Sequence, residues 1–262
     1  MKICSWNVNS LNVRLPHLEA WLAHARPDVV ALQETKLEDA RFPDGELATA
    51  GYRSVFAGQK TYNGVAILAR MDGPAAGGLH DVQVGIPGFD DPQRRVLAAT
   101  VNGVRIVDVY VVNGQSVGSE KYDYKLRWLD GLHGWLEGEL RMHPRLVLLG
   151  DFNIAPDDRD VHDPAVWHDG QILTSTAERA AYRRLLDLGL HDAYRALVPD
   201  GREFSWWDYR QAAFRRDIGL RIDLTLVSDA LRGECVAAGI DREPRTWERP
   251  SDHAPAWVQL AP

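Results

Sequence analysis

The chain has 262 residues, of which 45% are apolar, 26% charged and 9% aromatic. This ordinary globular composition excludes a disordered, collagen-like or coiled-coil protein, and a chain of this length can bury a core without disulfides. The formal net charge of −7 argues against a protein that coats nucleic acid non-specifically, although a local basic face can exist within an acidic total.

Cysteine usage and the N-terminus predict the compartment. Only Cys4 and Cys235 are present, far apart in the chain, which is no disulfide framework and favours a reducing environment. The first ten residues contain no apolar stretch typical of a secretory signal. No apolar run approaches the roughly 18 residues of a membrane span. We therefore expect a soluble, cytoplasmic protein with no membrane partner.

Short apolar, β-rich runs dominate the chain. Several are apolar almost throughout, which is typical of strands covered on both faces. In chain order the predicted strands are Lys2–Val8, Val29–Gln33, Gly51–Phe56, Val65–Ala69, Val96–Val101, Val104–Val111, Leu146–Gly150, Ile222–Val227, Val236–Gly239 and Ala256–Leu260.

Three segments have helical periodicity. Leu15–Ala25 and Tyr122–Leu140 carry apolar residues three or four apart, and Thr176–Leu188 follows Ser175, a residue typical of a helix N-cap. The Gly/Pro-rich stretches 71–78 and 85–92 are predicted to be loops rather than linkers. Since no composition shift divides the chain, residues 1–262 are expected to form one α/β domain with two sheets and helices packed outside them.

Polar residues lie at the predicted ends of the strands, where α/β proteins present functional groups. These are Asn7, Glu34, Asp151, Asn153, Asp252 and His253, while Asp223 lies inside the otherwise apolar run 220–227. Each of them alone is commonly a surface or turn residue. Together they are compatible with metal-assisted hydrolysis of a phosphate ester, because carboxylate oxygens suit Mg²⁺ or Mn²⁺ better than zinc.

Two local arrangements within this set support that chemistry. An aspartate beside His253 would fix its tautomer and stabilise the charged imidazolium, and Asp223 is a candidate for that role. Asp151 and Asn153 are two residues apart, so their side chains would point to the same side if the backbone stays extended.

Seven motifs occur in the order in which a known family has them and together span nearly the whole chain. They are Trp6–Ser10 (WNVNS), Gln33–Lys36 (QETK), Tyr62–Ile67 (YNGVAI), Gly150–Pro156 (GDFNIAP), Phe204–Arg210 (FSWWDYR), Gly219–Asp223 (GLRID) and Pro250–Pro255 (PSDHAP). The chain thus resembles the exonuclease III and AP endonuclease family of DNA-repair nucleases, within the endonuclease/exonuclease/phosphatase superfamily. The resemblance implies a four-layer αββα sandwich of two packed mixed β-sheets flanked by helices.

The resemblance also implies a metal site and a group that handles water. Glu34 would hold the divalent metal, Mg²⁺ with Mn²⁺ as a substitute, helped by Asn7 and Asp252. Asp151 would orient or deprotonate the attacking water or protonate the leaving oxygen, and these alternatives stay open. Asn153 would hydrogen-bond the scissile phosphate or the nucleophile.

Further contacts to the substrate follow from the same resemblance. His253, supported by Asp223, would contact a phosphate oxygen and stabilise the pentacovalent transition state. Tyr110 matches a phosphate-contacting tyrosine, and Asn113 matches a DNA-contacting asparagine.

An apolar pocket for a sugar without a base is implied at Trp206, Leu220 and Ile222. Such a pocket, too small for a base, would select an abasic deoxyribose. The alternative is that Leu220 and Ile222 are simply strand core.

Two departures from the family pattern bear on the substrate. Many members have proline where this chain has Val112, which leaves the Tyr110 and Asn113 positions intact. His168, in the loop after the Asp-Phe-Asn motif, could block a kinked abasic duplex while leaving 3′ ends accessible. A surface histidine without a role is an equally good interpretation.

Local positive charge would provide the remaining contacts to DNA. The candidate residues are Arg94, Arg95, Lys121, Lys125, Arg210, Arg215 and Arg216. If several of them line one face, binding should weaken steeply with salt.

The leading hypothesis is a metal-dependent, monomeric DNA-repair phosphodiesterase that acts on duplex DNA with blocked 3′ ends, nicks or abasic sites near the nucleoid. One alternative is 3′-end processing only, with little or no cutting at abasic sites. A second keeps the fold but acts on an inositol phosphate, a sphingolipid or an RNA tail. A third is a catalytically silent nucleic-acid-binding regulator, which ranks last because the candidate metal and Asp–His residues are all present.

Overall fold

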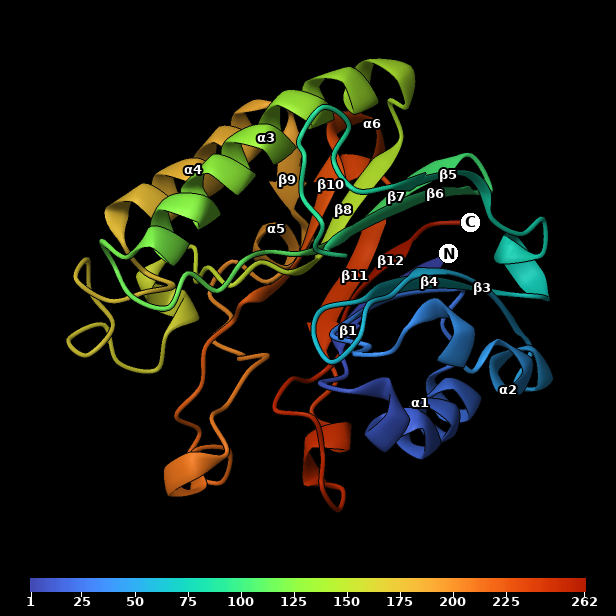
Figure 1. Cartoon of the computed structure of the whole chain (residues 1–262), viewed down its shortest axis with the longest axis horizontal. Helices are drawn as coiled ribbons and strands as arrows, with labels where there is room; N and C mark the ends of the chain where they lie inside the picture. The colour runs from blue at the N-terminus through green and yellow to red at the C-terminus, as the bar shows by residue number, and fades with distance from the viewer.

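The computed structural model describes all 262 residues and contains two six-stranded mixed sheets that pack face to face (Figure 1). The first sheet has the order β11 (Cys235–Ile240), β12 (Ala256–Leu260), β1 (Lys2–Asn7), β2 (Val29–Gln33), β4 (Val65–Arg70) and β3 (Tyr52–Ala57). The second has the order β5 (His80–Val84), β6 (Val96–Val101), β7 (Val104–Tyr110), β8 (Leu146–Asp151), β10 (Asp223–Ser228) and β9 (Leu190–Asp192).

Each sheet contains one parallel pair of strands at its centre. β1 runs parallel to β2, and β7 runs parallel to β8. Parallel neighbours need a crossover connection. Helices α1 (Leu11–Ala25) and α3 (Glu120–Met142) provide it. Because parallel strands end at the same edge, Asn7 pairs with Gln33 in one sheet and Tyr110 pairs with Asp151 in the other.

Apolar side chains fill three parallel spaces between the layers. One cluster, which includes Ile3 and Leu149, lies between the two sheets. Helices α1 and α2 (Asp44–Thr49) cover the outer face of the first sheet, and α3 with α4 (Thr176–Asp187) covers the outer face of the second (Figure 1). The predicted four-layer αββα architecture is therefore confirmed.

The three predicted helices are correct in position; the first two are predicted slightly too short, and the third, Thr176–Leu188, one residue too long. α1 begins at Leu11, four residues before the predicted Leu15, and α3 extends to Met142. The Ser119 hydroxyl accepts from the Tyr122 amide and caps α3. At α4, Ser175 and Glu178 form a reciprocal capping box, which fixes the start of that helix.

Several short elements have no counterpart in the sequence analysis. Strand β5 (HDVQV) is a largely exposed edge strand, and β9 has only three residues. The helices α2, α5 (Ala193–Leu197) and α6 (Asp229–Arg232) have six residues or fewer. Segments this short carry too few residues for a periodic pattern. No helix combines the length and apolarity that a bilayer crossing requires.

Candidate active site

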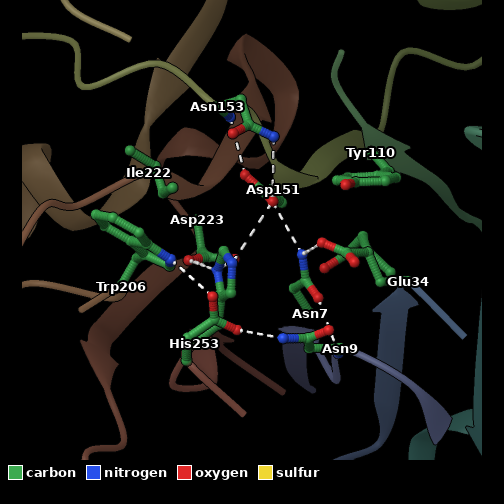
Figure 2. A network of polar contacts seen from close by, with 12 residues as sticks. Asn7, Asn9, Glu34, Tyr110, Asp151, Asn153, Trp206, Ile222, Asp223 and His253 are labelled. Carbon is green, nitrogen blue, oxygen red and sulfur yellow. Dashed lines mark hydrogen bonds and ion pairs between the residues drawn. The ribbon is translucent and has the colours of Figure 1, made fainter. Parts of the chain in front are cut away.

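The ends of four central strands converge at one edge of the sandwich. Strands β1 and β2 bring Asn7 and Glu34 from one sheet, and β8 and β10 bring Asp151 and Asp223 from the other. His253 arrives from the segment before β12. Figure 2 shows these side chains facing one another across the junction of the sheets. Residues separated by up to 246 positions in the chain therefore meet in one polar cluster.

The amide of Asn7 connects two carboxylates from different sheets. Its Nδ2 donates to Glu34 Oε1 at 2.9 Å and to Asp151 Oδ2 at 2.9 Å (Figure 2). Its Oδ1 accepts the backbone N–H of Asn9 at 3.0 Å. Asn7 thus holds both acidic side chains in fixed orientations.

Asp151 and Asn153 meet, but not through the extended backbone that the sequence analysis assumed. Asn153 has φ 48°, in the left-handed region, which asparagine tolerates better than most residues. The Asn153 N–H donates to Asp151 Oδ1 at 2.9 Å, and its Nδ2 donates to Asp151 Oδ2 at 3.3 Å. A tight turn, rather than strand alternation, puts the two side chains together.

His253 lies between two aspartates. Its Nδ1 is 2.9 Å from Asp223 Oδ2, and its Nε2 is 3.8 Å from Asp151 Oδ2. The expected pairing of Asp223 with His253 is therefore present in the structure. The Ser205 hydroxyl accepts the Asp223 N–H at 3.0 Å, so the loop before β10 holds the aspartate in place.

The pKa values of His253 and Asp151 both differ from their ordinary values. Burial acts to lower the pKa of His253, but the negative charges of Asp223 and Asp151 raise it to about 10. Burial and the nearby Asp223 raise the pKa of Asp151 to about 7, against the opposing effect of His253. At neutral pH the imidazole is therefore a cation, while the pKa of Asp151 lies close to the pH of the solution.

Two residues that the sequence analysis did not assign complete the first-sheet side of the cluster. The Lys36 ammonium lies 2.8 Å from Glu34 Oε2 and donates to Asn9 Oδ1 at 2.6 Å. Burial opposes the shift, but Lys36 holds the pKa of Glu34 below its usual value. Asn9 in turn donates to Asp252 Oδ1 at 2.9 Å. Lys36 belongs to the QETK motif and Asn9 to the WNVNS motif, so the motifs could have pointed to both residues.

Asp252 lies at the side of the cluster rather than at its centre. Its Oδ2 accepts the indole N–H of Trp206 at 3.0 Å. Burial acts to raise the pKa of Asp252, but His253 and these hydrogen bonds keep it below its ordinary value. The closest group of possible ligand atoms, all within 4.8 Å of one another, comes from Glu34, Asp151 and His253.

Tyr110 borders the carboxylates at the end of β7. Burial and the negative charges of Glu34 and Asp151 raise its pKa well above the ordinary value, so the phenol stays protonated. The Arg95 guanidinium lies over the ring, 4.5 Å from its centroid, and donates to the Tyr110 carbonyl at 3.1 Å. Asn113, three residues on, donates to Asn153 Oδ1 at 3.0 Å.

A cavity of about 810 Å³ opens beside the cluster. Its apolar wall includes Trp206, Leu220 and Ile222, and Trp167 faces it from the loop after β8. Leu220 and Ile222 also belong to a small buried cluster with Leu173. The two interpretations of these residues are therefore compatible, because they pack as core on one side and line the cavity on the other.

His168 is exposed and does not line the cavity, although its neighbour Trp167 does. Its Nδ1 accepts the Gly170 N–H at 3.2 Å, and its carbonyl accepts the Thr174 hydroxyl at 3.0 Å. The loop is thus folded upon itself, with the imidazole on the outside.

The basic residues expected to contact DNA are not equivalent. Lys125 is completely buried, so its prediction as a DNA contact is wrong. Arg210 is exposed and paired with Asp208. The others that reach the surface freely are Arg94, Lys121, Arg215 and Arg216.

The donor set of the cluster fits a divalent cation with a preference for oxygen. Asp151 is buried and Glu34 is partly buried, and both accept from the Nδ2 of Asn7. The Nδ1 of His253 is occupied by the Asp223 carboxylate, so the cluster offers mainly carboxylate oxygens. Such a set suits a hard ion.

Comparisons with known proteins identify the family and the fold. Residues 4–253 match the model of the Endonuclease/Exonuclease/phosphatase family. The exodeoxyribonuclease III of Haemophilus influenzae is 35% identical over 99% of this chain and 100% of its own length. The 3′-5′ exonuclease NExo of Neisseria meningitidis is 49% identical with a TM-score of 0.95, each chain covered completely.

An AP endonuclease from Archaeoglobus fulgidus superimposes with a TM-score of 0.94 at 35% identity, with 99% of both chains covered. A structure of the 3′ phosphatase NExo from Neisseria, bound to product DNA hairpin, has a TM-score of 0.95 at 49% identity, again covering 99% of both chains. The chain belongs to the Endonuclease/Exonuclease/phosphatase family and is a metal-dependent nuclease of the exonuclease III and AP endonuclease type.

Proposed function

We propose that this protein is a Mg²⁺-dependent DNA-repair phosphodiesterase that hydrolyses the 3′ ends of duplex DNA, as a 3′-5′ exonuclease and a 3′-phosphatase. The observation that carries the proposal is the cluster of Glu34, Asp151 and His253, all three of which line the cavity. The neisserial neighbours with these two activities are 49% identical to this chain. Residues 1–262 would act as one domain and as a monomer, at the nucleoid in the cytoplasm.

Glu34 would hold the Mg²⁺ ion, with Asn7 orienting its carboxylate and Asp252 assisting from the side. Mn²⁺ would be an effective substitute, because it accepts the same oxygen ligands. When bound, the ion polarises a phosphate oxygen and lowers the pKa of a coordinated water. The network around Asn7 supports this assignment, since it fixes Glu34 before any ion arrives.

The remaining side chains would handle the proton and the charge of the phosphate. Asp151, with a pKa of about 7, can take a proton from the attacking water or return one to the leaving oxygen. His253 carries a proton at neutral pH and would donate it in a hydrogen bond to a phosphate oxygen. Asn153 and the neutral phenol of Tyr110 would add further hydrogen bonds.

Cleavage 5′ of abasic sites is the second candidate activity. The observation in its favour is the apolar wall of Trp206, Leu220 and Ile222 beside the polar cluster, which suits a deoxyribose without its base. The exposed His168 would restrict this activity by obstructing a kinked duplex.

Two labelled duplexes distinguish these activities. One carries an internal abasic-site analogue, the other a nick that ends in a 3′-phosphate, and each is incubated with Mg²⁺ or with EDTA. Mg²⁺-dependent removal of the 3′-phosphate with an intact abasic strand is the expected result. Gain of abasic-site cleavage by H168G would then assign the restriction to His168.

Other outcomes would change the proposal. Efficient cutting at the abasic site by the unmodified protein would make it a general repair endonuclease and His168 a bystander. Hydrolysis of an inositol phosphate or a sphingolipid instead of either duplex would move it to another substrate class. DNA binding without turnover would favour a silent regulator.

A further inference from the structure

A fully buried lysine lies directly behind the site. Lys125 projects from α3, and its ammonium donates to the carbonyl of Asn153 at 2.6 Å, to the carbonyl of Asn113 at 3.2 Å and to the Glu178 carboxylate. Three donors meet three acceptors, so the ammonium is completely satisfied. Its stem and head are surrounded by protein, and it has no access to a ligand.

The partner of this lysine holds another part of the site. Glu178, also fully buried, accepts the N–H of Leu173 at 3.1 Å and both the N–H and the hydroxyl of Ser175. Leu173 ends the loop that forms one wall of the cavity. The Lys125–Glu178 pair therefore joins three separate segments: the turn after β7, the turn after β8 and the cavity loop.

The two turns tied by Lys125 carry Asn113 and Asn153, whose side chains line the cavity. Asn153 is held at φ 48°, and its Nδ2 donates to the Val111 carbonyl at 3.0 Å as well as to Asp151. Gly114 has φ 92° and passes so close that an added Cβ would lie 3.1 Å from Lys125 Cδ. The turn is thus packed onto the lysine stem.

Stability alone is a poor reason for this arrangement. Burying two charges costs several kcal/mol before their attraction repays it, and apolar pairs of similar volume are often at least as stable. An ammonium differs from an apolar group in having directional hydrogen bonds, and here two of the three end on the backbones of Asn113 and Asn153.

We propose that Lys125, held by Glu178, is a positioning residue of the nuclease, which sets the distance between the Asn113 and Asn153 turns so that Asn113 stays hydrogen-bonded to Asn153 and Asn153 to the catalytic Asp151. This inference rests on the proposed function. It assigns to Lys125 no contact with DNA and no proton transfer.

The test is the variant K125M/E178Q, which removes both charges and keeps side chains of similar length. Its matched control is R105M/E139Q, because Arg105 and Glu139 form another buried ion pair, at the other end of β7. Both variants and the unmodified protein are compared by thermal melting and by single-turnover removal of a 3′-phosphate in saturating Mg²⁺. Active-site titration gives the fraction of competent enzyme.

We expect K125M/E178Q to melt cooperatively and to lose about 10- to 100-fold in the single-turnover rate constant, the scale of a misplacement of about 1 Å. The control pair should keep the unmodified rate constant. A purely structural role would lower only the competent fraction, so a rate constant within twofold of the unmodified protein would overturn the inference.

If K125M/E178Q does not accumulate in folded form, K125R replaces it. A guanidinium keeps the charge but is larger, so it should displace both carbonyls and lower the rate constant in the same way; an unchanged rate constant would again overturn the inference. Absence of turnover by the unmodified protein would be a failure of the proposed function itself, which the same assay detects separately.

Discussion

Two buried aspartates on neighbouring strands of the second sheet have very different surroundings. Asp151, at the end of β8, contacts Asn7, Asn153 and His253 and lines the cavity. Asp108, in the middle of β7, accepts from the Gln33 side chain of the other sheet at 2.7 Å and has no charged partner. Burial raises the pKa of both carboxyls.

The difference shows what makes a buried carboxylate useful. Asp108 has no charged partner and does not line the cavity, and burial holds the pKa of its carboxyl well above the ordinary value where it links the two sheets. Asp151 has a cation at 3.8 Å and an open face, so it can change its charge beside a substrate. Burial alone is common to both, and the partners and the cavity distinguish them.

The largest expected effect is that of D151N. An amide has nearly the same shape but cannot exchange a proton with water or the leaving group, so the single-turnover rate should fall by about 10³- to 10⁴-fold. Retained DNA affinity, measured by fluorescence anisotropy, would show that the loss lies in the chemical step. Turnover within tenfold of the unmodified protein would remove Asp151 from proton transfer.

H253A should follow with a loss of about 10²- to 10³-fold, because the variant lacks the cation that faces the phosphate. Single-turnover rates at saturating DNA provide the measurement. An unchanged rate would refute the assigned role of His253 and leave Asp223 without a functional partner.

E34A should act through the metal. Loss of this carboxylate should raise the Mg²⁺ concentration for half-maximal activity by at least about tenfold, with the melting temperature nearly unchanged. A Mg²⁺ titration of the rate tests this expectation. A wild-type titration curve would disprove the metal assignment.

D108N, on the other side of the comparison, should leave the rate within about twofold of the unmodified protein. The substitution should instead change how the stability of the folded protein depends on pH. Because burial raises the pKa of Asp108, the folded protein binds more protons than the unfolded chain, and stability falls as the pH rises above 3.8.

D108N has no carboxyl at this position, so its stability does not fall with rising pH for this reason. Its melting temperature relative to the unmodified protein should therefore increase between pH 4 and pH 8. A difference that is constant over this range, or one that decreases, would contradict the raised pKa of Asp108.

Much of the site could be predicted from the chain itself. Polar residues that follow apolar strands, such as Asn7 and Glu34, are visible in the sequence, and parallel strands must end at one edge. The pairing of Asp223 with His253 could be anticipated from their residue types and from the family resemblance. The turn at Asn153 could not, because a left-handed residue leaves no periodic signal.

Buried charges were the least predictable part. Lys125 was expected on the surface and is buried. Its partner Glu178 lies 53 residues away on another helix, so the sequence around Lys125 gives no sign of the pair. The roles of Lys36 and Asn9 likewise depend on contacts between separate loops. A lone charged residue in a sequence does not reveal whether a partner will meet it.

The sequence by itself determined the order of the main strands and helices, the family, and the chemical groups available at the strand ends. These follow from local hydrophobic patterns and from short motifs, which are independent of distant contacts. The tertiary structure alone decided which of those groups share one cluster and which charge is shielded, as at Asp151, Asp108 and Lys125. Protonation and positioning depend on the distances between segments and on their burial, and both are set only when the two sheets pack together.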